Sequence, residues 1–230
     1  MQRLFIWDLN WTIETGSEIA LTKGMNEALI EFGFSQQVPL QVVIDNYGKT
    51  WEQIYLAALG DIPEEVLKEM RERAEYLCNR VHCPNDMTLR PYAKEVLETV
   101  CEQGGTNVII SNASQEGVNI MVEQLQITHL FQTMIGVSKN PLYQSKPHAA
   151  RTILNGSHYE RVISTGDSPG DLAIAYQLGC TGIGCKASTN GQSFVSYLLE
   201  IPQRQIPTTN ENHRVSDLRE IVQRELGVIL

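Results

Sequence analysis

The most constraining feature of the sequence is an alternation of short apolar runs with helical patterns. Apolar, often β-branched runs predict strands at 4–7, 107–110, 134–137, 162–165 and 181–184. From residue 93 onwards, amphipathic helical patterns separate these runs. Strands that alternate with helices are joined by right-handed crossovers and form a parallel sheet with helices on both faces. The sequence therefore predicts an α/β fold in which 181–184 is the last strand.

A long helical block interrupts this alternation directly after the first predicted strand. Apolar side chains repeat at helical spacing in four stretches, which are 18–32, 40–46, 50–59 and 63–81. We therefore predict two domains, an α/β core formed by 1–14 and 88–230 and an inserted all-helical domain formed by 15–87. Because the insertion follows the first strand, we expect it to cap the carboxyl edge of the sheet.

Polar residues follow three of the predicted strands. Asp8 comes after the first strand, Ser111 and Asn112 after the second, and Asp167 and Asp171 after the run at 162–165. Sites in such sheets form at the carboxyl ends of the strands, so we expect these side chains to meet. A carboxylate cluster suits Mg²⁺, which takes oxygen ligands and is often held by one or two carboxylates together with a substrate phosphate.

A cation completes this set, because Lys146 begins the predicted helix at 146–154. Phosphoryl transfer needs a nucleophile, positive charge on the phosphoryl oxygens, and hydroxyl or amide groups that orient them. Each of these residues taken singly is most often a helix cap or a turn residue. Their order on successive strand ends favours a site for phosphoryl transfer.

Composition limits the partners of the protein. A formal charge of −9 over 230 residues argues against nucleic acid, whose phosphates require a basic face, but allows a small anionic substrate. No apolar stretch approaches the roughly 20 residues that span a bilayer, so we expect no membrane association. Five cysteines without a C-x-x-C pair favour reduced thiols over a zinc site. We therefore expect a cytoplasmic protein, and the sequence sets no oligomeric state.

Four motifs occur in the order typical of the haloacid dehalogenase superfamily, and the chain resembles its capped phosphatase branch. The motifs are Asp8-Leu9-Asn10-Trp11-Thr12, the run 108–112 that ends in Ser111-Asn112, Lys146-Pro147, and Gly166-Asp167-Ser168-Pro169-Gly170-Asp171. The resemblance covers residues 4–186 and is strongest to phosphoglycolate phosphatase-like enzymes. It implies a Rossmann-like core, one helical cap, and Mg²⁺-dependent hydrolysis of a small phosphorylated metabolite.

The resemblance also implies a role for each acidic residue of the motifs. Asp8 attacks phosphorus and becomes an aspartyl phosphate. Mg²⁺ is bound by Asp8, by the backbone carbonyl of Asn10 and by Asp167, with Asp171 in support.

The phosphoryl group is assigned to a second set of residues by the same resemblance. Ser111 and the catalytic Lys146 hold its oxygens, and Asn112 and Thr12 help through hydrogen bonds.

Position 10 departs from the pattern of the family. Phosphatases of the family carry a second aspartate there, which protonates the leaving alcohol and then activates the hydrolytic water. Asn10 cannot transfer that proton, and loss of a general acid–base costs about 10²- to 10⁴-fold in rate. The residue is consistent with an engineered trap, with a natural variant that is slow or differs in activity, or with an impaired binding or regulatory protein. A phosphomutase is a further alternative.

Substrate selection is predicted for residues beside the site and in the cap. Lys49 and Trp51 lie in a loop between two predicted cap helices. We expect Lys49 to pair with a second anionic group of the substrate and Trp51 to stack on a ring or pack on aliphatic carbon. Trp11 replaces a common glycine and is expected to crowd the mouth of the site. A solvated lysine and packed tryptophans are the ordinary alternatives. Glu14 begins the linker into the cap, where we expect a hinge.

Overall fold

The computed structural model describes residues 2–46, 49–185, 212–215 and 217–230. The chain divides into two compact units, one formed by Met1–Glu14 with Leu89–Leu230 and the other by Thr15–Thr88. Between the units the chain runs through β2 (Glu14–Thr15) and β3 (Thr88–Leu89), which pair with each other. No helix in the described part of the chain is long and apolar enough to cross a membrane.

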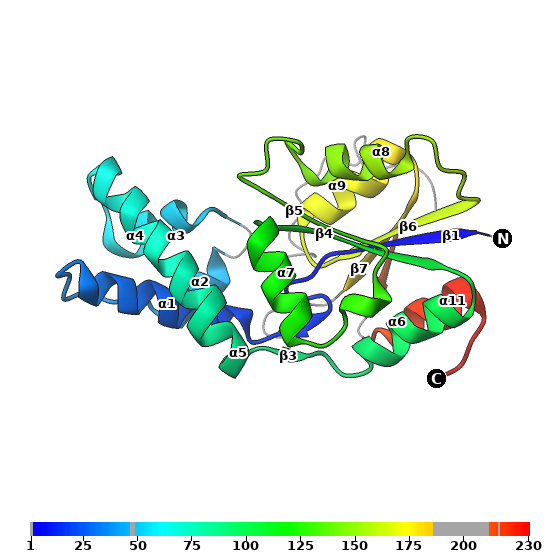
Figure 1. Ribbon diagram of the computed structural model, residues 1–230, viewed down its shortest axis with the longest axis horizontal. Coiled ribbons are helices and arrows are strands. Elements are labelled where there is room, and N and C mark those ends of the chain that lie inside the picture. Colours follow the sequence, from blue (N-terminus) through cyan, green and yellow to red (C-terminus); the bar gives the residue numbers. More distant parts are fainter. Residues whose placement is uncertain (1, 47–48, 186–211, 216) are drawn as a thin grey trace. The chain divides into compact units, whose positions relative to one another are not determined.

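Six strands within the described residues form one parallel sheet in the larger unit (Figure 1). In spatial order they are β5 (Thr133–Ser138), β4 (Thr106–Ser114), β1 (Arg3–Trp7), β6 (Arg161–Gly166), β7 (Thr181–Cys185) and β8 (Asn212–Val215). All neighbouring pairs are parallel. The predicted α/β fold with a parallel sheet is thus confirmed, and β1 lies inside the sheet with β4 and β6 beside it.

Two predictions about the strands were wrong. The sheet does not end with the strand at 181–184, because β8 (Asn212–Val215) pairs with β7 at the edge. Its four residues include one apolar side chain, and an edge strand pairs on one side only, so it needs no apolar run. In addition, Ser111 and Asn112 lie within β4, which continues to Ser114 with a shift in its register against β5.

Helices cover both faces of the sheet. They are α6 (Ala93–Glu102), α7 (Gln115–Gln124), α8 (Lys146–Leu154), α9 (Pro169–Leu178) and α11 (Arg219–Leu226). Helices α8 and α9 lie together on one face, and α6 and α11 on the other (Figure 1).

The packing of α8 and α9 follows from the alternation of side chains along the strands. Leu4 and Ile6 of β1 point toward this layer and are buried with Ala149 and Ala150 of α8. The small alanine side chains allow the helix to pack closely on the sheet. The first residue of α8 is therefore held near the carboxyl edge, where the site forms.

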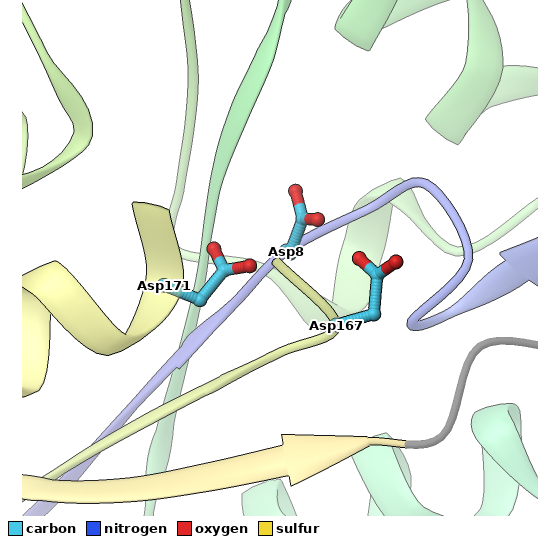
Figure 2. A group of neighbouring side chains, drawn as sticks. All are labelled: Asp8, Asp167 and Asp171. Carbon is cyan, nitrogen blue, oxygen red and sulfur yellow. The ribbon is translucent and has the colours of Figure 1, made fainter. Parts of the chain in front are cut away.

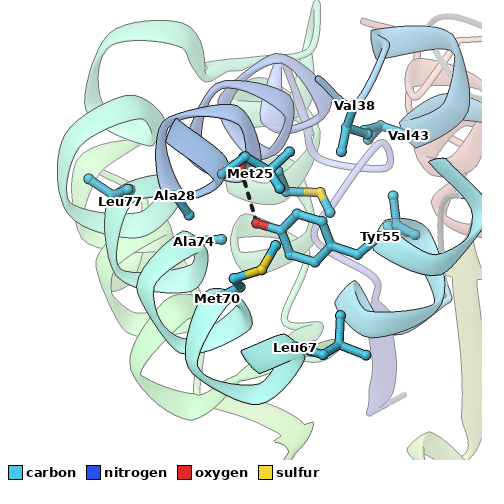
Figure 3. Packing of buried hydrophobic residues seen from close by; sticks show 11 residues of the cluster. Met25, Ala28, Val38, Val43, Tyr55, Leu67, Met70, Ala74 and Leu77 are labelled. Carbon is cyan, nitrogen blue, oxygen red and sulfur yellow. Dashed lines mark hydrogen bonds between the residues drawn. The ribbon is translucent and has the colours of Figure 1, made fainter. Parts of the chain in front are cut away.

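The smaller unit is helical. Its helices are α1 (Ser17–Glu31), α2 (Leu40–Asp45), α3 (Trp51–Leu59), α4 (Glu64–Leu77), a π-helical turn (Cys78–His82) and α5 (Cys83–Asp86). Met25, Tyr55 and Met70 are fully buried in its core, where the Tyr55 hydroxyl donates a hydrogen bond to the Met25 carbonyl at 3.1 Å (Figure 3). This core is separate from the core of the sheet, so the helical unit has its own hydrophobic stabilisation.

Candidate active site

The site is built around Asp8, the first residue after β1. The Asp8 backbone N–H donates to the Thr165 carbonyl at 2.8 Å, which extends the pairing of β1 with β6 by one residue. The side chain is almost buried and lies beside those of Asp167 and Asp171 (Figure 2). Each residue offers a carboxylate oxygen within 4.8 Å of the other two. The structure therefore brings together the three aspartates that the sequence placed at strand ends.

Asp171 is oriented by the start of α9. Its Oδ2 accepts hydrogen bonds from the Ser168 backbone N–H at 3.0 Å and from the Ser168 hydroxyl at 2.6 Å, and the first of these belongs to a capping box at the start of the helix. Gly166 is required beside it, because a Cβ atom at this position would occupy the place of the Asp171 carboxylate. The motif from Gly166 to Asp171 thus fixes one carboxylate of the cluster and supplies a second, that of Asp167.

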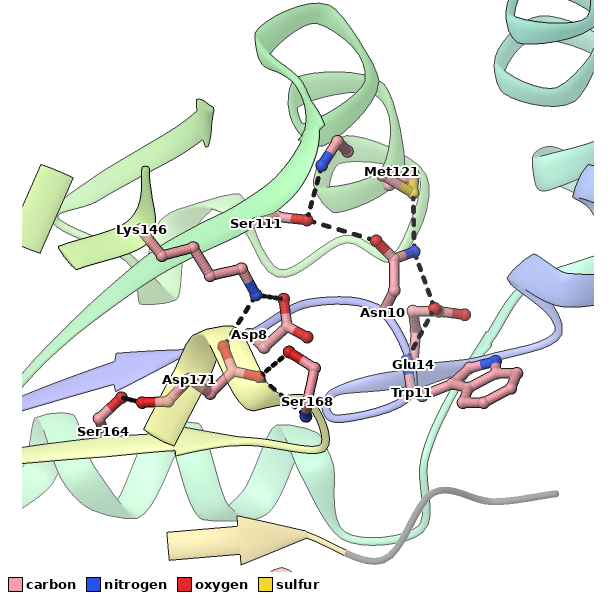
Figure 4. Close-up of polar contacts among 11 residues, drawn as sticks. Asp8, Asn10, Trp11, Glu14, Ser111, Met121, Lys146, Ser164, Ser168 and Asp171 are labelled. Atoms are coloured by element: carbon pink, nitrogen blue, oxygen red, sulfur yellow. Dashed lines mark hydrogen bonds and ion pairs between the residues drawn. The ribbon is translucent and has the colours of Figure 1, made fainter. Parts of the chain in front are cut away.

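Lys146 joins two of the carboxylates. Its Nζ donates to Asp8 Oδ1 and to Asp171 Oδ1, both at 2.8 Å, and its side chain is 2% exposed (Figure 4). Burial by itself would lower the pKa of Lys146, but the Asp171 and Asp8 carboxylates raise it above its ordinary value. Lys146 is therefore a fixed positive charge within hydrogen-bonding distance of the candidate nucleophile.

One lysine does not balance three buried carboxylates. Burial, followed by the nearby Asp171 charge, raises the pKa of Asp8 to about 6 in spite of Lys146. Burial and the charges of Asp8 and Asp171 also raise the pKa of Asp167 well above its usual range. A divalent cation would remove this excess of negative charge, and the donors are all oxygens, as Mg²⁺ prefers. Because Lys146 and Ser168 engage both oxygens of Asp171, Asp8 and Asp167 are the carboxylates best suited to bind the ion directly.

Two buried hydroxyl groups belong to Ser111, in β4, and to Thr12, in the turn that follows Asp8. Ser111 is buried, accepts a hydrogen bond from the Ala113 backbone N–H at 3.2 Å and donates to Asn10 Oδ1 at 3.3 Å. The Thr12 hydroxyl is fully buried and has no hydrogen-bond partner among the described residues. A buried orphan hydroxyl is what a bound anion or water satisfies. Asn112, by contrast, is exposed.

The carboxamide of Asn10 lies in a second network, which sequence reasoning missed. Its Nδ2 donates to Glu14 Oε1 at 3.0 Å and contacts Met121 Sδ at 3.6 Å (Figure 4). Glu14 was expected to be a linker residue, but it is fully buried and also accepts from the Trp11 backbone N–H at 3.2 Å. Only the spacing of four residues between an amide and an acid connects the two positions in the sequence.

Trp11 adopts a backbone conformation that favours glycine. Its backbone has a φ of 61°, a left-handed conformation that bulky residues rarely adopt. The Glu14 carboxylate binds its N–H, and Arg90 Nη1 donates to its carbonyl at 2.9 Å. The side chain is 1% exposed. These contacts hold a strained turn directly after the nucleophile.

The predicted specificity residues of the helical unit have ordinary environments. Lys49 is exposed and donates to Asn46 Oδ1 at 2.8 Å. Trp51 begins α3 and packs, partly buried, against the core of the helical unit. Tyr47 and Gly48 of the same loop lie outside the described residues. A role for Lys49, Trp51 or Trp11 in substrate selection stays a prediction.

Comparison with known families agrees with this geometry. The sequence pattern of the family described as haloacid dehalogenase-like hydrolase matches residues 5–185, which include all four motifs. The chain belongs to this family. The matched region of this haloacid dehalogenase-like hydrolase contains Asp8, Asn10, Ser111, Lys146 and the three-aspartate cluster described above.

Individual relatives of this hydrolase are named as phosphatases. The phosphoglycolate phosphatase of Mannheimia succiniciproducens is 29% identical over 199 residues, which cover 79% of this chain and 84% of that protein. A predicted phosphoglycolate phosphatase from Haemophilus somnus superposes with a TM-score of 0.76 at 21% identity, over 96% of each chain. A haloacid dehalogenase-like hydrolase from Streptococcus pneumoniae gives 0.74 at 15% identity, over 96% of this chain and 97% of that one. The two structures establish the likeness of the fold.

Proposed function

We propose that this hydrolase is a Mg²⁺-dependent phosphomonoesterase that acts on a small phosphorylated metabolite through an aspartyl phosphate on Asp8. The observation that carries the proposal is the Lys146 ammonium, which donates hydrogen bonds to Asp8 and Asp171 inside a buried cluster of three carboxylates. The likeness to phosphoglycolate phosphatases makes 2-phosphoglycolate the first substrate to test.

The first half of the reaction uses Asp8 as the nucleophile. An oxygen of its carboxylate bonds to phosphorus as the ester P–O bond breaks, and the electron pair of that bond leaves with the alcohol oxygen. Lys146 would hold one phosphoryl oxygen, since its Nζ donates to the Asp8 carboxylate. Ser111 would hold another, since it contacts Asn10, two residues after Asp8. In the second half, the oxygen of a water molecule bonds to phosphorus as the bond between phosphorus and the Asp8 oxygen breaks. The electron pair of that bond returns to the Asp8 carboxylate, and a proton of the water passes to solvent as inorganic phosphate leaves.

A bound Mg²⁺ would neutralise charge on the phosphoryl oxygens and on the carboxylates. Asp8, Asp167 and the Asn10 carbonyl are proposed as its protein ligands. Asp171 would support the site by holding Lys146 and the turn at Ser168, because its oxygens are already hydrogen-bonded to these residues.

Asn10 determines which substrates react well. Its amide can donate a hydrogen bond to the leaving oxygen or to water, but it cannot exchange a proton with either. The alcohol oxygen of an ester leaves without protonation where the alcohol is acidic, as in p-nitrophenyl phosphate. In an alkyl phosphate the leaving oxygen must be protonated. We therefore expect phosphorylation of Asp8 to be faster with p-nitrophenyl phosphate than with 2-phosphoglycolate, and hydrolysis of the phosphoenzyme to be slow.

Release of phosphate from p-nitrophenyl phosphate and 2-phosphoglycolate, with and without Mg²⁺, tests the proposal. The expected result is slow release that requires Mg²⁺ and is abolished in Asp8→Asn. Binding of the esters without release in any condition would instead support a binding protein. Interconversion of sugar phosphates without free phosphate would support a phosphomutase.

A further inference from the structure

Glu14 is a buried acid that contacts the side chain of Asn10. Its carboxylate is fully buried, and Oε1 accepts two hydrogen bonds, from Asn10 Nδ2 at 3.0 Å and from the Trp11 backbone N–H at 3.2 Å. Burial of a carboxylate is favourable only where hydrogen-bond donors replace water. The side chain of Asn10 supplies one of these donors.

This contact also fixes the direction of the amide. Oε1 of Glu14 accepts from the Trp11 backbone N–H and from Nδ2 of Asn10, so the NH₂ group of Asn10 faces Glu14 as a donor. The second side of the NH₂ group contacts Met121 Sδ, a weak acceptor, at 3.6 Å. Oδ1 is thereby turned to Ser111, which donates to it at 3.3 Å. Both ends of the carboxamide are used by matching partners.

We propose that Glu14 is a positioning residue that selects an amide at position 10 and holds its Oδ1 against Ser111. The catalytic part of this inference rests on the proposed function, because it takes Ser111 to be a phosphoryl ligand. The structural part does not. It follows that Asn10 is matched to its surroundings and is not an isolated replacement of the family's aspartate.

The alternative side chain shows the strength of the selection. In Asn10→Asp, a carboxylate oxygen would face Glu14 Oε1 where an N–H now lies, and both acids would be buried side by side. Two carboxylates without a hydrogen atom between them repel each other. Restoration of the aspartate of the family therefore requires a change at position 14 as well.

A thermal unfolding cycle in Mg²⁺-free buffer tests the pairing without reference to activity. Asn10→Asp is expected to lower the midpoint by about 4–8 °C, as expected for one buried polar group left unsatisfied in a chain of this size. Glu14→Gln keeps an acceptor and is expected to shift it by less. In the double variant N10D/E14Q, the second change should recover at least half of the loss caused by N10D. Equal loss from N10D in the native and E14Q backgrounds would overturn the pairing.

Rapid-quench phosphorylation of Asp8 by p-nitrophenyl phosphate tests the positioning role. Glu14→Ala is expected to lower the rate constant about tenfold, the size of one misplaced hydrogen bond, while Glu14→Gln restores it. The control is Glu225→Ala, which removes a buried acid whose side chain is 1% exposed and paired with Arg161, outside the contacts of the site. It should lower the unfolding midpoint and the amplitude of the burst but leave the rate constant unchanged.

The two ways of failing are distinguishable. If Glu14→Ala lowers only the burst amplitude, as the control does, Glu14 is structural and the positioning role is wrong. If no variant, including the native chain, becomes phosphorylated while the unfolding cycle still shows coupling, the proposed hydrolase function fails and the pairing of Asn10 with Glu14 stands.

Discussion

Asp8, the proposed nucleophile, has two unlike sides. On one side, Asp167, Asp171 and Lys146 lie buried together, and Lys146 forms ion pairs at 2.8 Å with Asp171 and with Asp8 itself. On the other side, the neutral amide of Asn10 donates a hydrogen bond to Glu14 and accepts one from the Ser111 hydroxyl. The contacts on the charged side are therefore ion pairs, and those on the amide side are hydrogen bonds of a neutral group.

In the proposed mechanism the two sides have different tasks. The charged side would bind and polarise a phosphoryl group. Proton transfer to the leaving group needs a titratable side chain, and position 10 carries an amide, which cannot supply the proton. Changes on the charged side should therefore cost far more than changes on the amide side.

The largest effect is expected from Lys146→Met. Loss of a preorganised cation should lower kcat by about 10²- to 10³-fold. Because Asp8 and Asp171 remain buried without their cationic partner, the free energy of unfolding should fall by about 3–5 kcal/mol. Phosphate release and urea unfolding measure the two effects.

A matched control is Lys23→Met in the helical unit. Lys23 pairs with Asp86, but its side chain is 49% exposed. The exposed pair should be worth less than about 1 kcal/mol and should not affect kcat. Similar losses of stability from both substitutions would show that burial of the cluster does not set its energetics.

The next effect is a dependence of stability on pH in the metal-free protein. Burial raises the pKa of Asp8 to about 6, above the value of about 4 for the unfolded chain. The folded state thus binds more protons in this window, and the free energy of unfolding should fall by about 3 kcal/mol as pH rises from about 4 to about 6. Urea titrations in EDTA measure the slope, and Asp8→Asn should flatten it. A slope of opposite sign would mean that Lys146 dominates the charged side.

A somewhat smaller effect is expected from Mg²⁺ at neutral pH. At 100 times its Kd, the ion should stabilise the native chain by about 2.7 kcal/mol, or about 5–10 °C in the unfolding midpoint. Asp167→Asn should lose most of this gain, because it removes the charge of one of the two carboxylates proposed to bind the ion. Asn10→Ala should keep it, since the proposed ligand at position 10 is a backbone carbonyl. Equal losses in both variants would place the ion on the amide side.

The smallest effect is expected from Met121→Leu. The substitution nearly conserves volume and removes a weak contact between sulfur and Asn10 Nδ2 at 3.6 Å. Unfolding should change by less than about 1.5 kcal/mol, and the rate of phosphorylation should not change. A large loss of rate would show that Met121, and not Glu14, sets the direction of the amide.

Much of the charged side could be predicted from the sequence. Residues that follow apolar runs at the carboxyl edge of a parallel sheet must meet, and Asp8 and Asp167 do so because β1 and β6 are neighbours. Lys146 was predictable as a cation at a helix start, although its two carboxylate partners depend on how α8 packs on the sheet.

The amide side was not predictable in the same way. Burial of Glu14 depends on a tight turn in which Trp11 adopts a positive φ, and no periodic pattern marks such a turn. An acid before a helical block looks like an exposed linker residue. The edge strand β8 was not predicted for a related reason, since it pairs with β7 through backbone hydrogen bonds, which require no apolar pattern in its side chains.

Acid-quenched mass spectrometry after mixing with p-nitrophenyl phosphate and Mg²⁺ tests the central claim most directly. We expect a phosphoryl group on the peptide that contains Asp8, accumulating because Asn10 cannot activate the hydrolytic water, and absent from Asp8→Asn. Release of phosphate without any phosphorylated Asp8, or phosphorylation that persists in Asp8→Asn, would contradict the account.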